Sequence, residues 1–128
     1  MNPLGIPLDQ RGDWLLYTAG PITSNCDGAM AEHVERARGI AVRLRRLGWS
    51  IVCPHLNSIE IAGFTLDDYL REDFAILRRC DALVLLPGWK NSKGAIREVE
   101  FVSKRLPTPL PVWDYTLLLM EGEPPCRT

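Results

Sequence analysis

Three side chains of this sequence have the types and spacing needed for acid–base and nucleophilic chemistry. Glu98 lies one helical turn after the loop 87–93, which leads out of an apolar run and into a helical pattern. Asp73 interrupts the apolar stripe of an earlier predicted helix, and Tyr17 lies near the end of a predicted strand. A carboxylate can attack an electrophile or move a proton, and a phenol can orient it through a hydrogen bond. We therefore take Glu98, Asp73 and Tyr17 as the candidate catalytic residues.

Asp73 also has an ordinary structural interpretation. A carboxylate on the buried face of a helix costs free energy unless it is paired, protonated or used in chemistry. At the edge of the stripe, however, Asp73 would simply bond to a backbone amide or to an arginine, and Tyr69, one turn earlier, is a further partner. The rest of this stripe is formed by Leu66, Leu70 and Leu77.

Glu98 poses the same choice between a functional and a surface residue. It lies beside the apolar stripe of its helix rather than opposite to it, and a lone helical glutamate is ordinarily exposed. Its position after a glycine-containing loop between strand and helix favours a function, because ligands of open α/β sheets bind beyond the carboxyl ends of the strands. The stripe consists of Ala95, Val99 and Val102.

The loop before Glu98 is suited to binding an anion. Ser92 is placed to cap the following helix, and Lys93 and Gly94 form its first turn. The free backbone amides of that turn, with the positive end of the helix dipole, attract a group such as phosphate. The other candidate binding residues in the loops after the strands are Gly20, Pro21, Ile22, Thr23 and Gly88.

Two rings near these loops remain open to two interpretations each. Trp89 has a face on which a nucleobase stacks, but the same ring is equally suited to cover the loop as packing. His55 follows the second predicted strand and has the reach to enter the site, whereas a structural or exposed histidine is the simpler interpretation.

Strands and helices alternate along the chain and would position these residues. The alternation predicts an α/β fold, a flavodoxin/Rossmann-like three-layer sandwich with a parallel sheet of four to five strands. We expect a single domain over residues 1–128, with an irregular leader at 1–12 and a short polar tail at 121–128. The predicted strands are 14–19, 49–53, 81–86 and 110–113, and the predicted helices are 29–47, 65–79 and 94–105.

The composition is that of an ordinary globular protein and excludes several classes. Of 128 residues, 46% are hydrophobic and 24% charged, and the formal net charge of −1 does not favour a nucleic-acid partner. No segment is long and apolar enough for a membrane span and there is no signal peptide, so we expect a cytoplasmic protein. Four scattered cysteines fit that compartment, and without a Cys-x-x-Cys pair we expect no metal and no cofactor.

The helix 29–47 carries a run of arginines. Such a run can recognise a polyanion, but a solvated helix face is the simpler interpretation in a chain of nearly neutral charge. The arginines are Arg36, Arg38, Arg43, Arg45 and Arg46.

Four segments, taken in order, resemble the nucleoside 2-deoxyribosyltransferase superfamily, and within it the DUF4406-like branch. The resemblance extends over residues 14–113 and is carried by the order and spacing of the segments together. They are Tyr17-Thr-Ala-Gly-Pro21, the element 48–54, Tyr69-Leu-Arg-Glu-Asp73, and the stretch 80–98 with its Gly-Trp-x-x-Ser-x-Gly-Ala-x-x-Glu pattern.

The resemblance implies a role for each catalytic candidate. Glu98 corresponds to the nucleophile that attacks the anomeric carbon of the sugar, and Asp73 to the acidic residue associated with the base and proton transfer. Tyr17 corresponds to the tyrosine whose hydroxyl lies near the nucleophile. Ser92 stands where enzymes of free nucleosides tend to have an aspartate and the 2'-deoxynucleoside 5'-phosphate N-hydrolases have a serine.

One motif departs from the phosphate-binding branch. That branch carries a serine and an arginine soon after the glycine of the first strand, whereas Gly20 is followed here by Pro21, Ile22 and Thr23. The polar groups available to compensate are Thr23, Ser24, Lys93 and the amides around Gly94.

We therefore expect an N-glycosidase that acts on (deoxy)nucleoside 5'-monophosphates through a covalent intermediate on Glu98. The alternatives are base exchange by a nucleoside 2-deoxyribosyltransferase and a nucleotide-binding module without catalysis. The resemblance also implies a homo-oligomer, either a dimer or a tetramer.

Overall fold

The computed structural model describes residues 5–21, 27–53 and 65–119. Its centre is a four-stranded sheet in the order β2-β1-β3-β4, formed by β1 (Leu15–Ala19), β2 (Ser50–Val52), β3 (Ala82–Leu85) and β4 (Val112–Asp114). All neighbouring strands are parallel, with Tyr17 opposite Val52 on one side and Leu83 on the other. The predicted α/β fold with a parallel sheet is confirmed.

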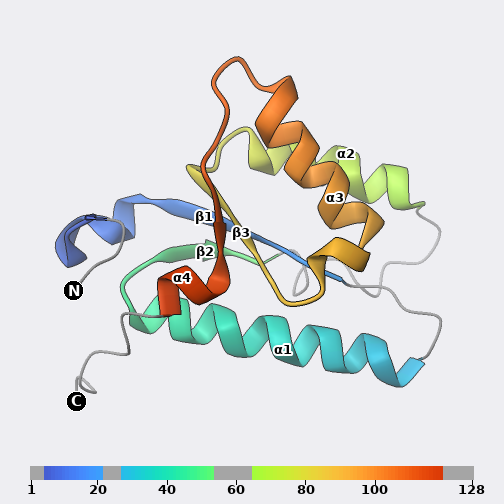
Figure 1. Ribbon diagram of the computed structural model, residues 1–128, viewed down its shortest axis with the longest axis horizontal. Coiled ribbons are helices and arrows are strands. Elements are labelled where there is room, and N and C mark those ends of the chain that lie inside the picture. Colours follow the sequence, from blue (N-terminus) through green and yellow to red (C-terminus); the bar gives the residue numbers. More distant parts are fainter. Residues whose placement is uncertain (1–4, 22–26, 54–64, 120–128) are drawn as a thin grey trace.

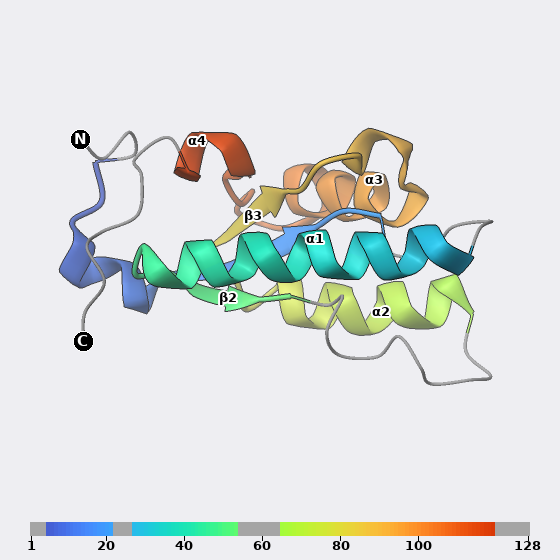
Figure 2. The same cartoon turned by 90° about the horizontal axis from the view of Figure 1, so that it is seen from below.

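Helices cover both faces of this sheet, which gives three layers (Figure 1). The long helix α1 (Asp27–Arg46) runs below the strands, with the short α4 (Tyr115–Leu119) beside it, as Figure 2 shows from below. On the opposite face lie α2 (Leu66–Leu77) and α3 (Lys93–Glu100). Alternate residues of β1 point to the two faces: Leu16 packs with the α1 layer, and Tyr17 with the α2 and α3 layer.

Local sequence signals fix where the helices begin and end. Thr65 caps α2 in a reciprocal pair of bonds with Asp68. The hydroxyl oxygen of Ser92 accepts from the amide of Ala95 at 3.2 Å and so caps α3. Gly48, at φ +100°, follows the end of α1 in the left-handed conformation that closes its last turn. The Ser92 cap was predicted from the sequence, and the predicted helices 65–79 and 29–47 begin and end within one residue of the other two boundaries.

The amino-terminal segment differs from the predicted irregular leader. Residues Leu8–Asp13 form a 3-10 helix, η1, whose Arg11 is only 2% exposed. Its guanidinium donates to the carbonyl oxygens of Leu47 at 2.9 Å and Ile6 at 3.3 Å, and lies 5.2 Å from the ring centroid of Trp49. These long-range contacts hold η1 against the end of α1, and no local pattern in the sequence signals them.

The carboxyl-terminal part of the described chain also differs from the prediction. The helix expected at 94–105 is α3 followed by a π-helical turn, η4 (Phe101–Arg105), in which the hydrogen bonding widens. The last strand lies at Val112–Asp114 rather than 110–113, and the short helix α4 after it was not predicted. The tail 121–128 lies outside the described residues. Among the helices of the described ranges, none is both long and apolar enough to cross a membrane.

Candidate active site

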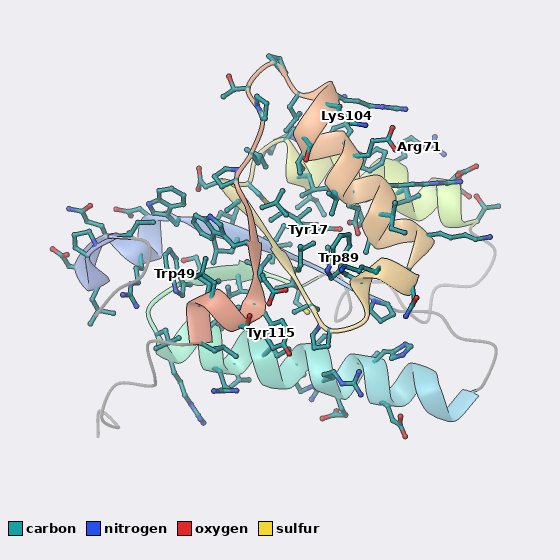
Figure 3. The ribbon with its side chains drawn as sticks, viewed as in Figure 1. Tyr17, Trp49, Arg71, Trp89, Lys104 and Tyr115 are labelled. Carbon is teal, nitrogen blue, oxygen red and sulfur yellow. The ribbon has the colours of Figure 1, made fainter. Side chains whose placement is uncertain are left out.

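Tyr17, Asp73 and Glu98 come from three elements and meet on one face of the sheet. Tyr17 is the central residue of β1 and is fully buried on the α2 and α3 side. Glu98, on α3, is 5% exposed, and Asp73, on α2, is half-buried. Figure 3 shows Tyr17 near the centre of the molecule, where these elements come together. The structure therefore brings together the three predicted catalytic candidates.

The Tyr17 hydroxyl links the two carboxyl groups. It donates a hydrogen bond to Oε2 of Glu98, and it also lies within hydrogen-bonding reach of Asp73. A phenol carries a single hydrogen and can donate it to one acceptor at a time. When Tyr17 donates to Glu98, a simultaneous bond to Asp73 requires a proton on the Asp73 carboxyl. The arrangement therefore couples the protonation of the two acids.

Burial raises the pKa of all three groups. The pKa of Glu98 rises to about 8 because the side chain is buried and because Asp73 is nearby, although the hydrogen bond from Tyr17 lowers it. Burial, with a smaller contribution from Glu72, raises the pKa of Asp73 to about 6, again against the lowering effect of Tyr17. Burial and the two carboxylates raise the pKa of Tyr17 well above its usual value. Between pH 6 and 8 the two acids thus hold about one proton between them.

The loops after β1 and β3 lie directly against each other. A Cβ atom added at Gly20 would lie 2.8 Å from Cβ of Leu86, so only glycine fits there without a shift. Gly88 has φ +81°, and its Cα faces the ring of Pro21. Gly20, Pro21 and Gly88 therefore belong to one continuous edge, as the topology predicted.

Three candidate binding residues lie on η3 (Trp89–Asn91) and at the start of α3. Ser92 and Gly94 are half-buried, and the Ser92 oxygen accepts the capping bond, which leaves its hydroxyl hydrogen for another acceptor. Trp89 is half-buried against the apolar cluster between the sheet and α3, with Nζ of Lys90 5.9 Å from its ring centroid. This contact supports the packing interpretation of Trp89, and base stacking stays a prediction. Ile22, Thr23 and His55, and the side chain of Tyr69, lie outside the described residues.

The sequence analysis did not single out His33 of α1 and assigned Arg36 to a solvated helix face, but both residues lie at this edge. His33 and Arg36 line a hollow of about 10 Å³ together with Pro21 and Pro87. Nδ1 of His33 is buried and has no hydrogen-bond partner among the residues that the structure describes. The two residues are three positions apart and so share one face of α1, the face turned to the loops. This spacing is the signal that could have identified them. The arginines predicted to form a solvated face of α1 are exposed, as expected.

The described residues offer no metal centre. Within 5–21, 27–53 and 65–119, no group of three or more histidine, cysteine, aspartate or glutamate side chains is arranged to hold a metal ion. Cys53 and Cys80 are free and buried, and burial raises the pKa of the Cys80 thiol to about 11. A neutral buried thiol is a poor nucleophile, so Cys80 is a packing residue.

Residues 14–108 match a family described as a domain of unknown function, DUF4406. The chain belongs to the DUF4406 family. The matched region extends from the residue before β1 to beyond η4, and so contains all three catalytic candidates and both loops of the edge. No curated protein matches the sequence. What this DUF4406 domain does must therefore be argued from its own site.

Proposed function

We propose that this protein is an N-glycosidase that cleaves the bond between base and sugar in nucleoside or deoxynucleoside 5'-monophosphates. The observation that carries the proposal is the buried carboxylate of Glu98, held by the Tyr17 hydroxyl and coupled to a second acid, Asp73. The resemblance of four segments to the nucleoside 2-deoxyribosyltransferase superfamily supports the same chemistry. On this proposal the DUF4406 domain is a branch of that superfamily.

The first step forms a covalent glycosyl-enzyme. The ionised Glu98 carboxylate attacks the anomeric carbon, the bond from that carbon to the base nitrogen breaks, and its electron pair leaves with the base. Asp73, with its pKa raised to about 6, is suited to deliver a proton to the departing base. Tyr17 fixes the direction of the attacking oxygen and stabilises its charge by hydrogen bonding.

The second step regenerates the carboxylate. Water attacks the anomeric carbon, the bond from the sugar to the Glu98 oxygen breaks, and the water proton passes to Asp73. The reactive arrangement in the first step has the shared proton on Asp73 and the charge on Glu98. Burial favours the opposite arrangement, and Tyr17 offsets this preference when it donates its hydrogen bond to Glu98.

A phosphate would lie at the edge formed by the loops after β1 and β3. The hydroxyl of Ser92 and the amides at the start of α3 are donors there, and serine avoids the repulsion that an aspartate would cause. Arg36 supplies positive charge beside Pro21, and Nδ1 of His33 is a buried polar atom without a partner among the described residues. They are the compensation we propose for the arginine that the loop after Gly20 lacks.

The direct experiment is to incubate the protein with each deoxynucleoside and ribonucleoside 5'-monophosphate and to measure free base by chromatography. The native protein should release base from at least one of them. Glu98→Ala should lower the rate at least about a thousandfold, because the nucleophile is removed. Glu35→Ala, an exposed glutamate of α1, is the matched control and should keep the rate within about twofold. Equal rates in native protein and Glu98→Ala would end the nucleophile assignment.

A nucleotide-binding module without catalysis is the second candidate, and one observation favours it. With a pKa of about 8, Glu98 is mostly a neutral acid at pH 7, which binds a ligand by donating a hydrogen bond. If the protein is such a module, a monophosphate should raise its melting temperature while no base is released. Base exchange predicts instead that a second free base raises turnover and yields a new nucleoside.

A further inference from the structure

The outer surface of α2 and α3 carries a groove of about 730 Å³ that contains none of the candidate site residues. Its walls are α2 on one side and α3 with η4 on the other, two segments that run side by side in Figure 1. Five arginines line it against two acidic residues, Asp67 and Glu100, although the whole chain has a net charge of −1. The arginines are Arg71, Arg78, Arg79, Arg97 and Arg105.

The positive charge of the groove is neutralised at one end only. Near the start of α2, Arg71 pairs with Asp68 at 2.6 Å and Arg97 pairs with Asp67 at 2.8 Å. The other three, Arg78, Arg79 and Arg105, form no ion pair with a carboxylate within the described ranges. Arg78 and Arg79 follow the last turn of α2, and Arg105 ends η4. Three arginines against one lining acid, Glu100, leave an excess of positive charge, which favours the binding of an anion.

The floor of the groove is apolar and aromatic. Phe74 of α2 and Phe101 of η4 stack with ring centroids 4.2 Å apart and planes inclined by 2°. The guanidinium of Arg78 lies 5.4 Å from the Phe101 centroid. Phe101 is only 4% exposed, so the half-buried Phe74 supplies the ring surface next to the guanidinium groups. This surface suits a ligand in which an anionic group is attached to an aromatic body. The volume lies within the range of about 300–1,000 Å³ typical of small-molecule sites.

We propose that this groove binds a phosphorylated small molecule with an aromatic body, its phosphates on Arg78, Arg79 and Arg105. Guanidinium groups bind phosphate oxygens in a forked geometry, which makes arginine better suited than lysine to this task. A second copy packed through the same face would bring two positive grooves together and repel. Duplex DNA would bring its phosphates against Asp67 and Glu100 on the rim.

The groove and the candidate active site lie on the same two helices. Phe74 and Arg97 line the groove, and their chain neighbours Asp73 and Glu98 contact Tyr17 instead. The groove proposal does not rest on the proposed function, because none of its residues belongs to that site.

The test uses titration calorimetry with adenosine 5'-triphosphate, inorganic tripolyphosphate and adenosine at about 50 mM salt. All proteins carry Ser92→Asp, which keeps a helix cap and repels phosphate at the loop edge. We expect one triphosphate per chain, tripolyphosphate more weakly and adenosine not measurably. Adding Arg105→Glu should weaken the binding of the triphosphate at least tenfold, and adding Arg105→Gln should weaken it by an intermediate factor. Arg38→Glu, the same charge reversal on α1, should weaken it less than twofold.

Three results would overturn the groove proposal. The first is the absence of triphosphate binding at millimolar concentration. The second is an equal loss of affinity with Arg105→Glu and with Arg38→Glu, and the third is an affinity that Arg105→Glu leaves unchanged. Tighter binding of duplex DNA than of the triphosphate, lost with Arg105→Glu, would also replace it by a nucleic-acid surface. Should Arg105→Glu fail to fold, as judged by circular dichroism, the affinity of Arg105→Gln is compared with that of Arg38→Glu instead.

Discussion

Arg11 and Glu98 are both ionisable side chains with an exposed fraction of 5% or less, but their surroundings differ. Arg11 donates to two backbone carbonyl groups and faces the ring of Trp49, so its charge has partners of the right polarity. Glu98 receives one hydrogen bond from Tyr17 and has another acid, Asp73, as its electrostatic neighbour. The surroundings of Arg11 stabilise its positive charge, whereas the surroundings of Glu98 disfavour a negative charge on that residue.

The difference separates a structural from a functional buried charge. A cation satisfied by backbone carbonyls ties η1 to the end of α1 and needs no ligand. A carboxylate whose burial raises its pKa, beside a second acid with a raised pKa, is an arrangement that costs folding free energy. Folded proteins retain such arrangements mainly at functional sites, so the cost itself marks Glu98 as the residue to test.

Arg11→Ala should have the largest effect on stability. It leaves the carbonyl groups of Leu47 and Ile6 without their donor and opens space beside Trp49, which should lower the free energy of unfolding by about 3–4 kcal/mol. Urea denaturation followed by circular dichroism measures the change. Arg38→Ala, an exposed arginine of α1 paired with Glu35, should change it by less than about 0.5 kcal/mol. Equal changes in the free energy of unfolding of the two variants would show that Arg11 has no special structural role.

Glu98→Gln should stabilise the protein, and more strongly as the pH rises. Below pH 4.5 Glu98 is protonated in the folded and unfolded states, so the substitution removes no penalty. Between pH 4.5 and about 8 the folded protein keeps a proton that the unfolded chain loses, so its stability falls with rising pH. The gain from Glu98→Gln should therefore grow across this window and reach about 4 kcal/mol at pH 8. Denaturation at pH 5 and pH 8 gives the measurement, and a gain that shrinks with pH would refute the raised pKa.

Tyr17→Phe tests the hydrogen bond that lowers the pKa of the two acids, an effect smaller than that of burial and opposite to it. The Tyr17 hydrogen bond lowers the pKa of both Glu98 and Asp73, so its removal should raise both values, by roughly half a unit to one unit each. NMR titration of the two carboxyl carbons in the native protein and in Tyr17→Phe provides the comparison. Unchanged or lower values in the variant would mean that the hydroxyl does not support the charge on these acids.

The sequence predicted the parts of the molecule that depend on neighbours along the chain. The caps at Thr65 and Ser92 and the apolar strands follow from local residue types, and so does the parallel sheet. The topology and the resemblance together predicted that Tyr17, Asp73 and Glu98 converge. Glu98 alone could not be recognised as buried, because its position beside the stripe left both orientations open.

Features that depend on distant partners escaped prediction. Arg11 is buried because the carbonyl group of Leu47, 36 residues away in sequence, accepts from it. The groove between α2 and α3 combines arginines of two helices, and each helix alone resembles an ordinary solvated one. His33 became visible only once α1 was found packed beside Pro21 and Pro87.

Attack of Glu98 on the sugar leaves a covalent glycosyl-enzyme that can be trapped. The protein is mixed with a monophosphate from which it releases base, quenched in acid within one turnover, digested and analysed by mass spectrometry. The peptide that contains Glu98 should gain the mass of the sugar phosphate less one water, and the corresponding peptide of Glu98→Gln should gain nothing. Release of base by the native protein with the sugar attached to another residue would contradict the attack by Glu98.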